Sequence, residues 1–143
     1  MNGSESGPAA KKVITTYNGV QHCAARREPH GNVVAMDCPY TGKGEEFSPG
    51  ELVQAAIAGC MLLSMGAVAM RRELDIAGAG INVATVMADS SPARIGSIDI
   101  TVTMPRCFAD EDRIRLEKAA DACPIKHSFD RDIPISVCYD YPE

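Results

Sequence analysis

The dominant feature of the hydropathy pattern is a long helix expected over residues 48–73, SPGELVQAAIAGCMLLSMGAVAMRRE. Ser48 offers a hydroxyl to the free N–H groups of the first turn, and Pro49 suits the first helical position, where no N–H is needed. Glu51 stands where its carboxylate can reach back to Ser48 and close a capping box. The start of the helix is therefore well defined.

The body of this helix is apolar on every face. From residue 52 to residue 70 only Gln54 and Ser64 interrupt a run of apolar and small residues, so no side of the helix suits water. A run of about 19 residues would also cover roughly 28 Å of bilayer, but this one is rich in Ala, Gly and Met instead of Leu and Ile. We therefore expect it to be buried inside protein.

Alternation of apolar and polar residues predicts strands on both sides of the helix. The Asn18-Gly19 and His30-Gly31 pairs are typical turn signals and divide the first strands into an antiparallel meander. Residues 81–88 and 95–104 predict a hairpin. The six strands are expected at residues 12–17, 20–25, 32–36, 81–88, 95–104 and 133–139.

A second, amphipathic helix is expected at residues 110–122, with Ile114, Leu116, Ala119 and Ala120 on its inner side. The element order is thus βββ, α, ββ, α, β, which indicates an α+β fold. We expect one domain over residues 11–143, preceded by a polar segment, residues 1–10, that we expect to be disordered.

The strands are too few to cover an all-apolar helix from both sides. A second copy of the chain would supply the missing cover, so we expect an obligate homodimer. The alternative is a monomer whose sheets enclose both sides of the helix.

Composition narrows the function. The net charge is −5 and the sequence pI is about 5.2, so no positive field favours nucleic acid. No glycine-rich phosphate loop occurs, and no cofactor is expected. The first residues lack the basic start and apolar run of a secretory signal, so we expect a cytoplasmic protein with no membrane association.

The six cysteines are the candidate chemistry. No CxxC pair occurs, and the Cys-x3-His spacing of Cys123 and His127 has no second matching pair, so no metal site is expected. Cys60 in the long helix fits either a small, inert core residue or a nucleophile. Cys38 lies in a turn-rich loop and suits an exposed, accessory thiol.

The motifs around two of these cysteines resemble those of the OsmC/Ohr family of thiol peroxidases. Ser-Pro-x-Glu-Leu and Ala-x-x-Gly-Cys lead to Cys60, and Ala-x-x-Cys-Pro follows about 60 residues later at Cys123. The resemblance covers nearly the whole chain. It implies an OsmC-like fold, in which two intertwined subunits bury their long helices together.

The resemblance also implies the chemistry. Cys60 would attack an organic hydroperoxide and become a sulfenic acid, which Cys123 would resolve as a disulfide for a dithiol reductant, a lipoyl or thioredoxin-type protein, to reopen. A buried thiol needs a cation to become a thiolate. In the family this is an arginine of the first strands, which leaves Arg27 or Arg26 here, although either also fits a solvated loop charge.

One position departs from the family pattern. The better-known peroxidases carry an acid ten residues before the helix cysteine, where this chain has Gly50; its acid is Glu51, nine residues before Cys60. Nine steps of about 100° place the two side chains on opposite faces, about 13 Å apart along the helix. Glu51 is thus either a catalytic acid or a helix cap. The departure also leaves a second hypothesis, a non-catalytic module that binds an apolar small molecule in the dimer pocket.

Overall fold

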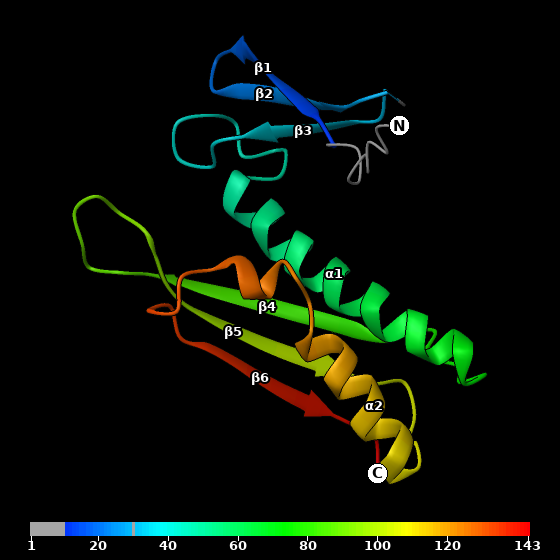
Figure 1. The fold of residues 1–143 in the computed structure, drawn as a ribbon. Helices are drawn as coiled ribbons and strands as arrows, with labels where there is room; N and C mark the ends of the chain where they lie inside the picture. Colours follow the sequence, from blue (N-terminus) through cyan, green and yellow to red (C-terminus); the bar gives the residue numbers. More distant parts are fainter. Residues whose placement is uncertain (1–10, 30) are drawn as a thin grey trace, which may run out of the picture. The chain divides into compact units, whose positions relative to one another are not determined.

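A computed structural model describes residues 11–29 and 31–143. The chain forms two compact units, Met1–Leu52 and Val53–Glu143, and each contains a three-stranded sheet (Figure 1). The observed order of elements is the predicted βββ, α, ββ, α, β. The segment expected to be disordered, residues 1–10, lies outside the described residues, and a single domain over residues 11–143 stays a prediction.

The first unit is built on the predicted meander. Its strands are β1 (Val13–Gly19), β2 (His22–Arg27) and β3 (Val33–Asp37), paired antiparallel in that order. The first turn falls at Val20 and Gln21, two residues later than the Asn18-Gly19 signal indicated, and both have positive φ, 53° and 59°. Two left-handed residues match the twist of a tight hairpin, so the strand geometry overrides the poor fit of a β-branched valine there.

Helix α1 spans Pro49–Arg71 and begins as the sequence predicts. The Ser48 N–H donates to Glu51 Oε2 at 2.8 Å, and the Glu51 N–H donates to Ser48 Oγ at 3.2 Å. Each side chain thus satisfies a backbone donor that the first turn leaves free. The predicted capping box is confirmed.

The second unit pairs a sheet with two helices. Strand β5 (Ile95–Thr103) lies in the middle, antiparallel to β4 (Gly80–Met87) and parallel to β6 (Ile135–Asp140). A parallel neighbour needs a crossover connection, which is supplied by α2 (Asp110–Asp121) and the short 3-10 helix η1 (Lys126–Ser128). Strands β4 and β5 form the second hairpin that the sequence predicts.

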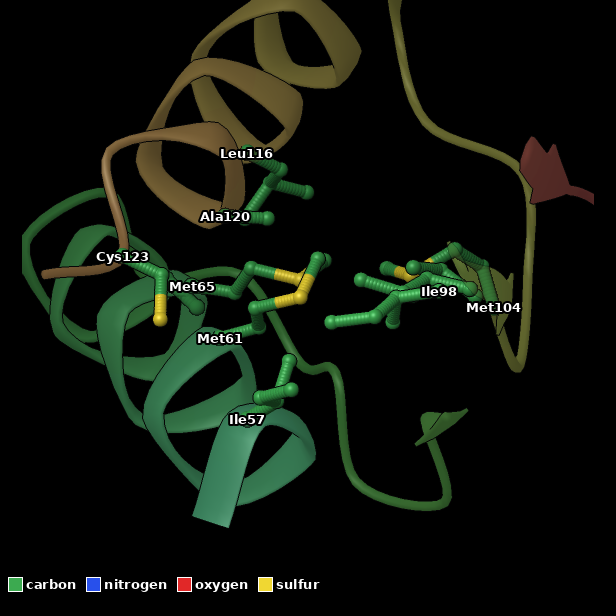
Figure 2. Packing of buried hydrophobic residues seen from close by; sticks show 11 residues of the cluster. Ile57, Met61, Met65, Ile98, Met104, Leu116, Ala120 and Cys123 are labelled. Atoms are coloured by element: carbon green, nitrogen blue, oxygen red, sulfur yellow. The ribbon is translucent and has the colours of Figure 1, made fainter. Parts of the chain in front are cut away.

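The core of this unit joins one stripe of α1 to one face of β5 and to α2 (Figure 2). The α1 residues recur every fourth position, which is the spacing of a single helix face. Full burial of such side chains stabilises the fold by about 1.5–3 kcal/mol each. The buried hydrophobic residues are Ile57, Met61, Met65, Ala69, Ile98, Ile100, Val102, Met104, Leu116, Ala120 and Cys123.

Helix α2 turns a narrower face to this core than the sequence indicated. Leu116 and Ala120 are buried as expected, but Ile114 is 53% exposed, so its predicted inward position is wrong within this chain. Ile114 lies about 200° around the helix from Leu116. The burial of Leu116 therefore turns Ile114 away from the sheet.

The single chain covers only part of α1. Leu63 is 78% exposed and Met70 is 83% exposed. The helix is long enough, and with a mean hydropathy of 1.9 apolar enough, to cross a membrane, although a core helix of a soluble protein has the same properties. Leu63 and Met70 therefore need further apolar contacts to be shielded from water.

Candidate functional site

Cys60 lies in the middle of α1, at the edge of the core. It is half-buried and packs against the buried cluster, next to the fully buried Met61. Its carbonyl oxygen accepts a hydrogen bond from Ser64 Oγ at 2.8 Å, one turn later. Cys60 is more than two turns from the N-terminus of α1, well beyond the first turn, where the helix dipole acts most strongly.

Cys123 lies two residues after the end of α2, where the chain turns toward η1. It is 0% exposed, and Figure 2 shows it between α2 and α1. The Lys126 N–H donates to Cys123 Sγ at 3.4 Å. The Cys123 N–H donates to the Ala120 carbonyl at 3.2 Å, so the end of α2 holds the residue in place.

The two thiols interact although 63 residues separate them in sequence. Burial raises the pKa of the Cys123 thiol, hydrogen bonding with Cys60 raises it further, and the Lys126 N–H acts in the opposite direction. Cys123 thus stays protonated and can donate its S–H to the sulfur of Cys60. All six cysteines are free, so this is a reduced pair.

The candidate arginines lie on β2 and point to opposite faces of the first sheet. Arg26 forms an ion pair with Glu28 at 2.9 Å, whereas within the described part of the chain Arg27 has no ion pair. Both are exposed. They belong to Met1–Leu52 and the interacting thiols to Val53–Glu143, so activation of Cys60 by either arginine stays a prediction.

Glu51 has a structural task. Its carboxylate accepts the Ser48 N–H in the capping box, and Gly50 offers no acid in the position that the better-known peroxidases use. The helix-cap interpretation of Glu51 is confirmed, and its catalytic role stays a prediction.

The turn after Cys123 contains a contact that the sequence did not predict. A Cys-Pro step at a helix end signals a turn, but not that the Lys126 N–H would point at the sulfur. His127 instead hydrogen-bonds through Nε2 to the Asp121 carbonyl oxygen at 2.7 Å. Within residues 11–29 and 31–143, no three His, Cys, Asp or Glu side chains are grouped to hold a metal ion.

The fold is shared with several solved structures. An osmotic stress induced and detoxification response protein from Psychrobacter arcticus 273-4 is 32% identical, over 96% of this chain and 99% of that chain, with a TM-score of 0.82. An organic hydroperoxide resistance protein, OsmC, from Legionella pneumophila is 13% identical, over 93% of this chain and 99% of that chain, with a TM-score of 0.69. OhrB of Bacillus subtilis is 14% identical, over 92% of this chain and 98% of that chain, with a TM-score of 0.67. The last two show the fold alone.

The sequence itself identifies the family. Residues 42–137 match the family model described as OsmC-like protein, and this range includes both Cys60 and Cys123. No curated protein matches the sequence. With the match over more than half of its length and with the Psychrobacter relative, the chain belongs to the OsmC-like protein family.

Proposed function

We propose that this protein is a thiol peroxidase that reduces organic hydroperoxides, with Cys60 as the attacking thiol and Cys123 as the resolving thiol. The observation that carries the proposal is the interaction of these two side chains from distant parts of the sequence. The names of two proteins with the same fold, organic hydroperoxide resistance proteins, support the substrate class.

The reaction has two steps within the chain. The Cys60 thiolate attacks the outer oxygen of the hydroperoxide, the O–O bond breaks, and the leaving alkoxide takes up a proton to become an alcohol. Cys60 is then a sulfenic acid. The Cys123 sulfur attacks the Cys60 sulfur, a disulfide forms, and the hydroxyl group leaves as water. An external dithiol then reduces the disulfide.

The environment of the thiols supports this division of roles. Cys123 is fully buried and its pKa is raised, so it suits the second, intramolecular step better than attack on a substrate from solvent. Cys60 is only half-buried. A nearby Arg27 would stabilise its thiolate, and we favour Arg27 over Arg26 because Glu28 already neutralises Arg26.

The apolar surroundings of Cys60 suggest the preferred substrate. Met61 and Met65 of α1 lie in the same core as Cys60 and have adaptable side chains. The organic group of a hydroperoxide gains from an apolar environment of this kind, while hydrogen peroxide does not. The reductant is proposed to be a dithiol, of lipoyl or thioredoxin type.

The assembly is proposed to be a homodimer in the cytoplasm. The open positions of α1, Leu63 and Met70, need apolar cover, and a second α1 would provide it. OsmC-like proteins are soluble, which agrees with α1 as a core helix of the assembly.

A second candidate function is a binding module without catalysis. It is favoured by Gly50 in the position of the family acid and by the engagement of Glu51 in the helix cap, because an arginine without a carboxylate to orient it is less well positioned. Such a module would bind an apolar small molecule in a pocket formed by the proposed homodimer.

Consumption of cumene hydroperoxide with excess dithiothreitol tests both functions. We expect Cys60→Ser to abolish turnover, and Cys107→Ser, at an exposed cysteine, to retain it. Hydrogen peroxide should be a poorer substrate. An inactive wild-type protein that still binds cumyl alcohol would favour the binding module, and equal activity of Cys60→Ser and wild type would refute the role of Cys60.

A further inference from the structure

A second pair of cysteines lines a cavity within the first unit. The cavity has a volume of about 370 Å³ and mostly apolar walls, formed in part by Tyr17, Cys23, Met36 and Cys38. Cys23 pairs with Met36 across β2 and β3. Cys38 follows two residues after Met36, and its N–H donates to the Gln21 carbonyl at 3.3 Å, so it lies on the same face of the sheet.

The strand register keeps these two thiols apart. Cys23 and Cys38 are diagonal neighbours, and Cα atoms in such positions lie about 7–8 Å apart. Disulfides need Cα distances of about 4.4–6.8 Å. Cys38 is therefore available to an external partner instead of being consumed by Cys23.

The loop after Cys38 is wound tightly around it. The Gly42 N–H donates to the Cys38 carbonyl at 2.8 Å, and Thr41 Oγ1 donates to Gln21 Oε1 at 3.1 Å. A Cβ atom at Gly42 would meet the Cys38 carbonyl oxygen at 2.7 Å and the Cys38 nitrogen at 3.2 Å. Backbone contacts this short cannot be relieved by a side-chain rotation, so the loop requires glycine at this position.

This loop also affects the acidity of the thiol. Hydrogen bonding with the Thr41 side chain, and then with the backbone of Thr41 and Tyr40, lowers the pKa of Cys38. The thiolate is the nucleophilic form of cysteine. The loop therefore enriches the reactive form of Cys38 at neutral pH.

We propose that Cys38 is a second reactive thiol, separate from Cys60 and Cys123, that forms mixed disulfides with small disulfides whose apolar substituent occupies the cavity beside Cys23. The Cys38 thiolate attacks one sulfur of the small disulfide, a new S–S bond forms, and the other sulfur leaves as a thiolate. No further oxidant is required, because one disulfide replaces another.

The test uses the reduced wild-type protein and 4,4′-dithiodipyridine, a neutral aromatic disulfide, at less than one equivalent. Peptide mapping by mass spectrometry then gives the rate at each cysteine, so reaction at Cys60 is counted separately. We expect Cys38 to react at least about fivefold faster than the exposed Cys107 and Cys138, because the hydrogen bonds of its loop favour the thiolate form of Cys38. Equal rates at these three residues would overturn the proposal.

Two further measurements test the role of the loop and the cavity. Gly42→Ala should slow the reaction of Cys38 and leave that of Cys107 unchanged. In the wild-type protein, the small polar disulfide of cysteamine should show a smaller preference for Cys38 than the aromatic one. If Gly42→Ala keeps the wild-type rate, or if both disulfides show the same preference, the loop and the cavity do not control the site and the proposal fails.

Discussion

The two units of the chain differ in how many of their hydrophobic side chains are buried. In the part of the chain that the structure describes, all of the buried hydrophobic residues belong to Val53–Glu143, where α1, α2 and β5 enclose them. Among the described residues of Met1–Leu52, only Asp37 is buried, and apolar residues such as Val13, Tyr17 and Val33 are exposed. The second unit has a core of its own, while the first is a meander with little internal packing.

This difference separates two requirements of the proposed chemistry. The thiol pair is held by a packed core, so its geometry is fixed by the second unit alone. The candidate arginines lie on β2 of the first unit. A three-stranded sheet is stable only when other parts of the protein cover its apolar face. The position of the arginine that we propose to activate Cys60 would therefore depend on what covers that sheet, which in our proposal includes the second copy of the chain.

The largest expected effect comes from opening the core. Leu116→Ala should lower the free energy of unfolding by about 2–5 kcal/mol, because the cavity would lie in a fully packed region. Ile114→Ala, on the exposed side of the same helix, should cost under about 1 kcal/mol. Urea unfolding measures both. Equal losses would show that Ile114 is covered in the assembled protein.

The next effect concerns the open positions of α1. Leu63→Glu should weaken the proposed homodimer at least about tenfold, because a charge would be buried without a partner. Met87→Glu, at a residue of β4 that is 57% exposed, serves as the control. Light scattering across a dilution series measures the mass. A monomeric wild-type protein would contradict the homodimer.

A smaller effect is expected at the start of α1. Glu51→Ala should cost about 1 kcal/mol of stability, because the capping box loses one side. Glu51→Gln should restore most of this loss, since glutamine also closes the box. Peroxide turnover of the stable Glu51→Gln variant then separates capping from catalysis, because a fall in turnover at unchanged stability would show a chemical role.

The smallest effect is the pH dependence caused by Cys123. An unfolded thiol loses its proton near its ordinary pKa of 9.0, whereas the folded protein retains it to higher pH. From about pH 8 to pH 10 the unfolded state therefore binds fewer protons, and stability falls as pH rises. Urea midpoints of the reduced protein should fall less steeply in Cys123→Ala than in wild type. Identical slopes would contradict the raised pKa.

Local features of the sequence predicted most of the fold. The capping box of Ser48 and Glu51 and the alternation in the strands depend on near neighbours in the chain, so they are visible without tertiary information. The exposure of Ile114 was missed because the packing of Leu116 decides which face of α2 turns inward. The first turn was misplaced because hairpin twist outweighed residue preference at Val20.

The candidate site was predictable only in part. Cys60 and Cys123 came from resemblance to a family, since nothing in their spacing shows that α1 and the end of α2 meet. The Lys126 N–H at Cys123 and the approach of Gly42 to Cys38 are backbone contacts. Any residue with a backbone N–H could donate to Cys123 from position 126, so no pattern of side chains in the sequence predicts this contact.

The most direct test of the central claim is to treat the reduced protein with about one equivalent of cumene hydroperoxide and to map its peptides. We predict a loss of two hydrogens in the intact mass and a single disulfide between Cys60 and Cys123. The Cys123→Ser variant should instead stop at a Cys60 sulfenic acid, which dimedone traps. If both thiols remain unchanged in the wild-type protein, Cys60 and Cys123 are not a peroxidase pair.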